Sequence, residues 1–294
     1  METNTAAAHA ATGPAIVRTV AELRARVTGW RRTGDRIAMV PTMGALHDGH
    51  LSLVRIGFER AERVVVSIFV NPTQFAPHED FQSYPRTEVR DMELLELLGT
   101  DLVFAPSAAE MYPPGFATRI ETAGPALGLE SDTRPHFFGG VATVVSKLLI
   151  AANPDLAIFG EKDYQQLAVV RRMARDLGLP VEIVGAPTVR EPDGLAMSSR
   201  NAYLSPEERD IAPVLHDVLM QTAAALRGGV TPDQALDDGR RAILAAGFRA
   251  LDYLDLRDAQ TLEPVPDGSA SGRPLRLLVA AWLGRTRLID NCAV

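Results

Sequence analysis

The stretch RIAMVPTMGALHDGHLSLVRIGFERAE, residues 36–62, contains one complete structural unit of the predicted fold. Arg36–Val40 is a short apolar run typical of a buried strand, and Pro41 ends it. Gly49–Glu62 follows a glycine-containing turn and has the apolar spacing of a helix. Its apolar positions are Leu51, Val54, Phe58 and Ala61. A strand, a tight turn and a helix in this order predict one unit of a parallel sheet covered by helices.

The same order of elements recurs along the next part of the chain. Arg63–Val70, RVVVSIFV, is almost continuously apolar, as a strand covered on both faces should be. Further strands are predicted at Asp101–Phe104, Leu156–Phe159 and Val181–Val184. Helices are predicted at Val89–Leu98, Gly140–Ala152 and Gln165–Leu177. The predicted fold class is therefore α/β, a Rossmann-like doubly wound parallel sheet that binds ligands at the carboxyl ends of its strands.

The pattern changes near residue 187, where prolines become frequent and Asp193-Gly194 predicts a tight turn between two extended pieces. Helices are then predicted at Pro206–Arg227 and Thr231–Ala246, and strands at Leu251–Leu256, Leu275–Leu283 and Thr286–Ile289. We expect a first domain over residues 1–187 and a smaller α+β C-terminal domain over residues 188–294. Residues 1–13, METNTAAAHAATG, are expected to be disordered.

The composition and charge of the chain exclude several classes of protein. The chain has 294 residues, of which 46% are hydrophobic and 23% charged, as in a globular protein with a buried core. A formal charge of −7 argues against nucleic acid or an anionic membrane as the main partner. No apolar run is long enough to span a membrane, and the N-terminal stretch lacks the features of a signal peptide. With a single cysteine, Cys292, the expected location is cytoplasmic.

Pro41–His50, PTMGALHDGH, is a candidate phosphate site. It leads from a strand into a helix, so its backbone amides and the positive helix end are expected to point to one place. His47 and His50 could donate hydrogen bonds there, and Gly44 and Gly49 would let a ligand approach the backbone. An ordinary turn with two solvent-exposed histidines is the alternative. A zinc site is less favoured, because no further ligands follow at suitable spacing.

Three other polar segments could reach the same edge of the sheet. Gly160–Gln166, GEKDYQQ, carries Lys162, whose ammonium suits a phosphate. Met197–Arg200, MSSR, offers two hydroxyls and a guanidinium that could clamp a triphosphate. Asn71–Phe75, NPTQF, offers an amide to a small polar substrate. Each segment, taken alone, could equally be a solvated loop or a turn.

In combination, these strings resemble the pantothenate synthetase (pantoate–β-alanine ligase) family of the HxGH nucleotidyltransferase-like superfamily. The matching strings cover roughly residues 36–205, in the order PTMGALHDGH, SIFVNPTQF, YPRT, GVATVVSKL, GEKDYQQL and MSSRNAYLS. The resemblance implies that pantoate attacks the α-phosphorus of ATP, giving pantoyl adenylate and pyrophosphate. The amine of β-alanine then attacks the acyl carbon and releases AMP. It also implies a homodimer, and Mg²⁺ carried by the ATP phosphates without direct protein ligands.

Motif matching also implies the role of each site residue. The catalytic residues would be His47, His50, Lys162, Ser198, Ser199 and Arg200. ATP would be bound by these six and by Met43, Gly44, Ala45, Leu46, Asp48, Gly49, Gly160, Glu161, Asp163, Val189 and Met197. Gln74 and Gln166 would hold pantoate, and Gln74 would also meet β-alanine. The methyl groups of pantoate would contact Met43, Val144 and Val145.

The string RPHFFGGV, residues 134–141, departs from the family pattern. An ungapped register places Phe137 where the family commonly has a histidine, and Gly139 where it has a basic residue. We expect a small backbone shift to bring His136 into the vacant role. The alternative is that the contact is absent and that Gln74, Gln166 and Lys162 alone hold the pantoate carboxylate. Two other functions stay open. One is a nucleotidyltransferase of the same superfamily that acts on another small acid or phosphate. The other is a non-catalytic nucleotide-binding module. The presence of His47, His50, Lys162 and Arg200 argues against it, because binding alone does not need them all.

Overall fold

The computed structural model describes residues 13–76, 79–265 and 272–294. The predicted disorder over residues 1–13 therefore lies almost wholly outside the described residues. Six parallel strands form one sheet in the order β1-β4-β3-β2-β5-β6. Their bounds are Ala15–Val17 (β1), Ile37–Thr42 (β2), Arg63–Ile68 (β3), Leu102–Phe104 (β4), Leu156–Gly160 (β5) and Glu182–Ala186 (β6). This is the predicted α/β fold.

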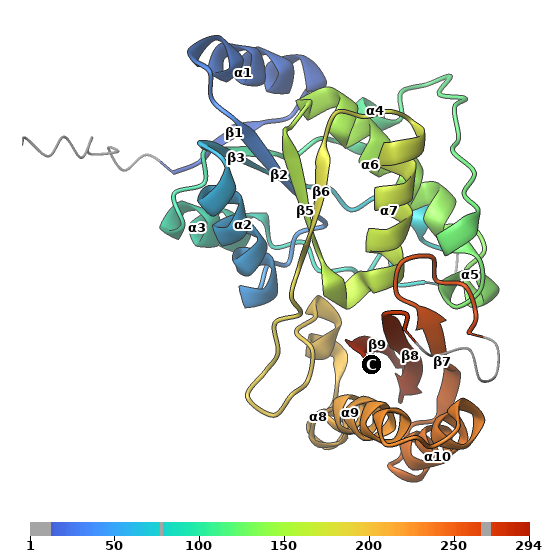
Figure 1. Cartoon of the computed structure of the whole chain (residues 1–294). Helices are drawn as coiled ribbons and strands as arrows, with labels where there is room; N and C mark the ends of the chain where they lie inside the picture. Colours follow the sequence, from blue (N-terminus) through green and yellow to red (C-terminus); the bar gives the residue numbers. More distant parts are fainter. Residues whose placement is uncertain (1–12, 77–78, 266–271) are drawn as a thin grey trace, which may run out of the picture.

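Helices cover both faces of this sheet (Figure 1). On β2, Ile37 and Met39 face one core while Ala38 and Val40 face the other, because successive side chains of a strand alternate. The first core also contains residues of α1 (Val20–Thr33), α6 (Phe137–Ala152) and α7 (Tyr164–Asp176). The second contains residues of α2 (Asp48–Arg60) and α3 (Glu88–Leu97). The sequence reading missed β1 and α1. A three-residue strand leaves almost no periodic signal, and α1 has only two buried residues, Leu23 and Val27.

The strand order places the ligand edge of the sheet. From β2 the chain runs outward through β3 to β4, and then returns to the other side of β2 as β5. The carboxyl ends of β2 and β5 therefore flank the point where the direction of winding changes, which is where such sheets bind ligands. Short turns at the same edge of the sheet are η1 (Pro72–Gln74), which follows β3, and η3 (Glu161–Asp163), which follows β5.

The C-terminal elements lie below the carboxyl ends of the parallel strands (Figure 1). An antiparallel sheet consists of β7 (Ala250–Asp258), β8 (Leu275–Leu283) and β9 (Thr286–Ala293). Helices α8 (Pro206–Ile211), α9 (Val214–Arg227) and α10 (Pro232–Ala245) accompany it. The prediction of one helix over Pro206–Arg227 was wrong. Pro213 has no amide hydrogen for a continuing helix, and it stands at the N-cap of α9 instead.

The other elements of the described residues are short helices and 3₁₀ turns. The short elements are α4 (Ala108–Met111), η2 (Gly124–Ala126), α5 (Glu130–Thr133) and η4 (Ser199–Tyr203). Among the described residues, no helix has the length and apolar character needed to cross a bilayer. The division of the chain at residues 187 and 188 stays a prediction, with the last parallel strand ending at Ala186.

Candidate active site

A cavity of about 700 Å³ lies between the carboxyl ends of the parallel strands and the C-terminal sheet. Most of the predicted site residues line it, namely Met43, His47, Gly49, His50, Gln74, Val144, Val145, Gly160, Lys162, Asp163, Gln166, Val189, Met197, Ser198, Ser199 and Arg200. Gly44, Ala45, Leu46, Asp48 and Glu161 are not part of its lining. The structure thus brings together segments that lie far apart in the sequence.

The two histidines are held with the same ring nitrogen turned toward the backbone. His47 is the N-cap of α2, and its Nδ1 accepts a hydrogen bond of 3.2 Å from the amide of Gly49. The Nδ1 of His50 accepts from the amide of His47 at 3.4 Å. Because Nδ1 is an acceptor in both rings, each neutral imidazole carries its proton on Nε2. Both Nε2–H groups are therefore available as donors to a ligand.

Burial keeps both imidazoles uncharged. Burial, aided by the nearby charge of Lys162, lowers the pKa of His47 to about 4 and that of His50 to about 3. The positive charge on this side of the cavity comes instead from Lys162, whose side chain is 20% exposed. Its Nζ lies 3.7 Å from the Asp163 carboxylate. The arrangement offers one ammonium and two neutral donors to an anionic ligand.

Four of the loop amides that were expected to point to a ligand already have acceptors within the protein. The amides of Ala45 and Leu46 donate to the carboxylate of Asp91, at 3.0 and 2.9 Å, and are not free for a phosphate. The amides of His47 and Gly49 are used by the two imidazoles, as described above. These four amides are therefore engaged, and we expect the side chains of His47, His50 and Lys162 to be the main donors to a phosphate here.

Asp91 fixes the shape of this loop. It lies in the first turn of α3, is only 1% exposed, and also accepts a hydrogen bond of 3.1 Å from the hydroxyl of Thr87. Ala45 has a φ of 50°, in the left-handed region that residues other than glycine seldom adopt. The carboxylate stabilises that conformation by binding the amide of Ala45 and the next one. The sequence reading missed Asp91, because an acidic residue in a first helical turn is common.

Gln74 is fixed in the cavity wall by its neighbours. It is 8% exposed, and its Oε1 accepts from Asn71 Nδ2 at 3.1 Å. Its Nε2 lies 3.1 Å from the sulfur of Met43, a weak acceptor that leaves this amide available to a stronger one. A Cβ at Gly140 would lie 2.4 Å from the carbonyl oxygen of Thr73. Glycine at this position therefore allows α6 to pack directly against the turn that carries Gln74.

One end of the cavity is apolar. Val144 and Val145 of α6 are both 5% exposed, and Phe137, Phe138 and Phe159 also line the cavity. Gln166, at the start of α7, contributes a further amide side chain to the lining. This combination suits a small ligand with both branched aliphatic carbons and hydroxyl or carboxylate groups.

The expected backbone shift at His136 was wrong. His136 is the residue before α6 and does not line the cavity, and its Nε2 has no hydrogen-bond partner among the described residues. Arg134 does line the cavity. Its guanidinium donates to both oxygens of Glu79 at 2.7 Å and lies 3.9 Å from the ring centroid of Phe137. Arg134 stacks on the ring of Phe137 in the cavity wall. A cation therefore lies beside this ring although the backbone has not shifted.

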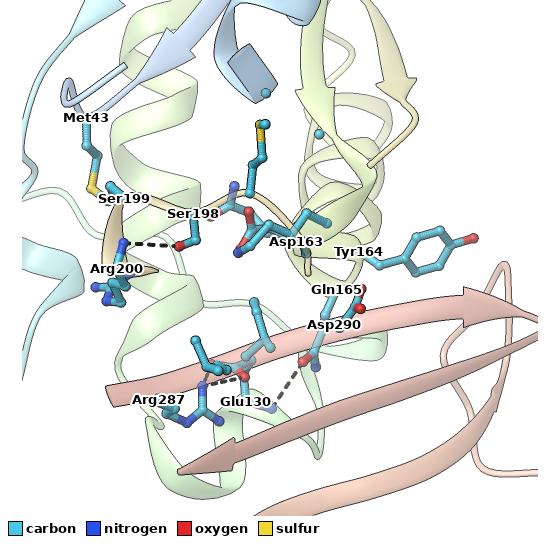
Figure 2. Close-up of a pocket in the computed structure, with 18 of the residues that line it drawn as sticks. Met43, Glu130, Asp163, Tyr164, Gln165, Ser198, Ser199, Arg200, Arg287 and Asp290 are labelled. Atoms are coloured by element: carbon cyan, nitrogen blue, oxygen red, sulfur yellow. Dashed lines mark hydrogen bonds and ion pairs between the residues drawn. The ribbon is translucent and has the colours of Figure 1, made fainter. Parts of the chain in front are cut away.

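The Met197–Arg200 segment is closed onto the first half of the chain. Ser198 caps η4 by accepting from the amide of Arg200, as Figure 2 shows. Ser199 Oγ lies 3.2 Å from the hydroxyl of Tyr84. Arg200 forms two hydrogen bonds with the Asp80 carboxylate, at 3.1 and 3.0 Å, and this pairing keeps the pKa of Arg200 raised despite its burial. Asp80 and Tyr84 were not recognised from the sequence.

A second charged cluster at the far wall was also missed. Glu130 is 6% exposed and accepts from Arg287 at 2.8 and 2.9 Å and from the hydroxyl of Tyr253 at 2.7 Å (Figure 2). Arg287 also donates to Asp252 at 2.6 Å. Burial against the Glu130 carboxylate raises the pKa of Tyr253 well above its usual value. The sequence carried little signal for this cluster, since Arg287 lies between Thr286 and Leu288 at the start of β9.

Comparisons with known proteins agree over nearly the whole chain. A family model described as Pantoate-beta-alanine ligase matches residues 15–293. The pantothenate synthetase of Mesorhizobium japonicum is 59% identical over 281 residues, 96% of this chain and 98% of that protein. That of Caulobacter vibrioides is 59% identical over 286 residues, 96% of this chain and 99% of that protein.

Solved structures are similar over the same extent. The crystal structure of pantothenate synthetase from Thermus thermophilus has a TM-score of 0.87 and 50% identity, over 95% of this chain and 98% of that one. A pantoate-β-alanine ligase from Francisella tularensis, complexed with beta-gamma ATP and β-alanine, has a TM-score of 0.80 and 33% identity. That comparison covers 95% of this chain and 97% of the other.

Proposed function

The chain belongs to the pantoate-β-alanine ligase family, and on this premise we propose that its cavity joins pantoate to β-alanine through a pantoyl adenylate. The observation that carries the proposal is the division of a single cavity. One side of the cavity carries the ammonium group of Lys162 and the neutral imidazoles of His47 and His50. The other side carries amide side chains beside an apolar wall. The first suits the phosphates of ATP and the second suits pantoate. The comparisons favour this ligase over another nucleotidyltransferase.

In the first step, a carboxylate oxygen of pantoate attacks the α-phosphorus of ATP, and the bond from that phosphorus to the β-phosphate oxygen breaks. Negative charge accumulates on the leaving pyrophosphate. His47, His50 and Lys162 would bind that charge through Nε2–H and Nζ–H donors that are already oriented. No serine or cysteine nucleophile is needed, since the substrate carboxylate is the attacking group.

In the second step, the amine of β-alanine attacks the acyl carbon, the bond to the AMP oxygen breaks, and the amine releases a proton. Gln74 would orient pantoate and meet β-alanine, and Gln166 would bind the other polar groups of pantoate. Val144 and Val145 would contact the two methyl groups. Because the acyl adenylate reacts with water, a closed cavity favours amide formation over hydrolysis.

The C-terminal part would act as the lid of this cavity. Met197–Arg200 would contact the triphosphate, with Val189 beside the nucleotide. Arg200 is bound to Asp80 in this structure, so its contact with phosphate would exchange one anionic partner for another. The ion pair would therefore hold the segment in place until ATP enters.

Mg²⁺ would enter with the ATP phosphates. Among the described residues, no group of three or more His, Cys, Asp or Glu side chains is placed to hold a metal ion. Mg²⁺ dehydrates reluctantly and is commonly held in large part by waters and substrate phosphates, so it would be carried by ATP without a direct protein ligand. The ion would supply charge neutralisation at the phosphates. A homodimer and a cytoplasmic location belong to the same proposal, the first from the family resemblance and the second from the lone cysteine.

The test is an exchange assay followed by product analysis. Radiolabelled pyrophosphate should enter ATP only when pantoate is present, and adding β-alanine should give pantothenate and AMP in equal amounts. ADP as a product, or exchange that is independent of pantoate, would refute the proposal.

Two substitutions at His50 test the role of a neutral donor. Loss of the donor in His50→Ala should lower exchange by about 10²- to 10³-fold. His50→Gln, whose amide nitrogen can occupy the position of Nε2, should retain more activity than the alanine variant. His136→Ala is the matched control, because that histidine lies outside the cavity lining. Equal losses in His50→Ala and His136→Ala would contradict the assignment.

A further inference from the structure

The turn that carries Lys162 is held from the C-terminal sheet. Glu161–Asp163 forms the short η3 between β5 and α7, and Asp163, the N-cap of α7, makes no side-chain capping hydrogen bond. The carbonyl oxygens of Glu161 and Lys162 both accept from Asn291 Nδ2, at 2.9 Å each. Asn291 lies on β9, about 130 residues further along the chain. In Figure 2 the strand carrying Asp290 passes just below Asp163.

The orientation of the Asn291 amide is determined by its partners. Its Oδ1 accepts from Arg276 Nε at 2.7 Å. An arginine can only donate and a carbonyl oxygen can only accept, so oxygen and nitrogen of this amide cannot be exchanged. The side chain is 3% exposed, and each of its three hydrogen bonds is therefore formed away from bulk water.

Arg276 strengthens the same connection. Its guanidinium lies 4.0 Å from the ring centroid of Tyr164, the residue that follows the turn. Its Nη2 lies 3.3 Å from the Glu161 carboxylate. Asn291 and Arg276 thus bind the turn through two backbone carbonyls, one carboxylate and one ring. Of these two residues, only Asn291 donates a hydrogen bond to the carbonyl oxygen of Lys162.

We propose that Asn291 is a positioning residue for Lys162, which it holds at the distance from His47 and His50 that the phosphates require. This role rests on the proposed function, because it presumes that Lys162 binds the phosphates of ATP. Without the two hydrogen bonds from Asn291, the carbonyl groups would turn toward other donors and the lysine would sample several positions. Returning Lys162 to its productive position would then add to the activation free energy of the reaction.

The test compares two substitutions at Asn291 with a neighbour on the same strand. Asn291→Asp keeps the size and the acceptor for Arg276 but replaces the donor by an oxygen, and Asn291→Ala removes both without adding charge. Each should lower kcat/KM for ATP in pantoate-dependent exchange by about 10- to 100-fold. Cys292→Ala changes the adjacent side chain, which contacts Leu219 rather than the turn, and should leave that ratio within about twofold.

A double-mutant cycle separates positioning from a general loss of structure. In a Lys162→Ala background, Asn291→Asp and Asn291→Ala should each cost less than about threefold, because the side chain that Asn291 positions is gone. Losses of the same size in both backgrounds would overturn the proposal, and so would a Cys292→Ala variant as impaired as Asn291→Ala. Should the aspartate variant not fold, the alanine variant completes the cycle.

The outcomes also separate this role from the proposed function. A folded wild-type protein that shows no pantoate-dependent exchange refutes the proposed function and this role with it. An active wild type with additive losses refutes the role of Asn291 alone.

Discussion

Asp91→Asn is the substitution that should reveal how the histidine loop is held. Asp91 accepts the amides of Ala45 and Leu46 and the hydroxyl of Thr87 in a site that is 1% exposed. An asparagine keeps the shape but has only one oxygen. In the better orientation its oxygen serves Leu46 and Thr87, and its NH₂ group then faces the amide of Ala45.

The cost of this change follows from the hydrogen bonds lost. One buried amide donor is left without an acceptor, at about 1–3 kcal/mol, and the remaining bonds lose the strengthening that a charged acceptor gives. We therefore expect the free energy of unfolding to fall by about 2–4 kcal/mol. Ala45 has a φ of 50° and would relax toward a more common conformation, which displaces the following His47. Exchange activity should fall by about 10²-fold or more.

The assay combines pantoate-dependent pyrophosphate exchange with urea unfolding. Glu93→Gln is the matched control, because it makes the same change of charge on an exposed residue of the same helix. Exchange should be measured well below the unfolding midpoint, so that the loss reports the folded enzyme. Wild-type activity in folded Asp91→Asn, or an equal loss in Glu93→Gln, would refute the reasoning.

Three further predictions follow from the cavity and its walls. Gly140→Ala should raise KM for pantoate at least about tenfold, since a Cβ there would lie 2.4 Å from the carbonyl oxygen of Thr73 and displace the turn that carries Gln74; unchanged steady-state kinetics would contradict this. Arg134→Met should lower the free energy of unfolding in urea by about 3 kcal/mol, because the half-buried Glu79 loses its ion pair, while the control His136→Ala should stay close to wild type; equal stabilities of the two would contradict it. Finally, the low pKa of His47, about 4, means that the unfolded chain binds more protons than the folded one between pH 6.5 and 4. The contribution of the neutral His47 ring to the free energy of unfolding is therefore fully present above pH 6.5. As the pH falls through that window, this contribution decreases by up to about 3 kcal/mol. Urea titrations across this range should show a shallower pH dependence for His47→Gln than for wild type, and identical slopes would contradict the assignment.

Much of the architecture could be predicted from local patterns. Apolar runs such as Arg63–Val70 predict strands covered on both faces, and parallel strands bring their carboxyl ends to one edge. That reasoning placed His47, His50 and Lys162 near each other, and the structure has all three in one cavity lining. The split of the predicted helix at Pro213 could also have been anticipated from the ring of proline.

The contacts that orient these residues could not be predicted in the same way. Asp91 and Asn291 are common residue types in ordinary elements, and nothing nearby in the sequence indicates that one binds loop amides and the other binds two carbonyls. Arg134 was passed over for the same reason, since its partner Glu79 lies 55 positions away. Local patterns determine where an element lies, whereas hydrogen bonds between distant elements determine which groups remain free for a ligand.

The position of Asp91 in the chain has a consequence for biosynthesis. It lies 45 residues after the amide of Leu46 that it binds, so the ribosome completes the histidine loop well before its anchor exists. A nascent chain that has emerged only as far as β3 contains both imidazoles but no carboxylate to fix the left-handed turn at Ala45. The loop can take its final shape only when α3 docks on the sheet. The histidine loop should therefore take its shape abruptly during translation, with the docking of a helix that itself never lines the cavity, and the nucleotide site is completed later, once Lys162 and Met197–Arg200 have been added.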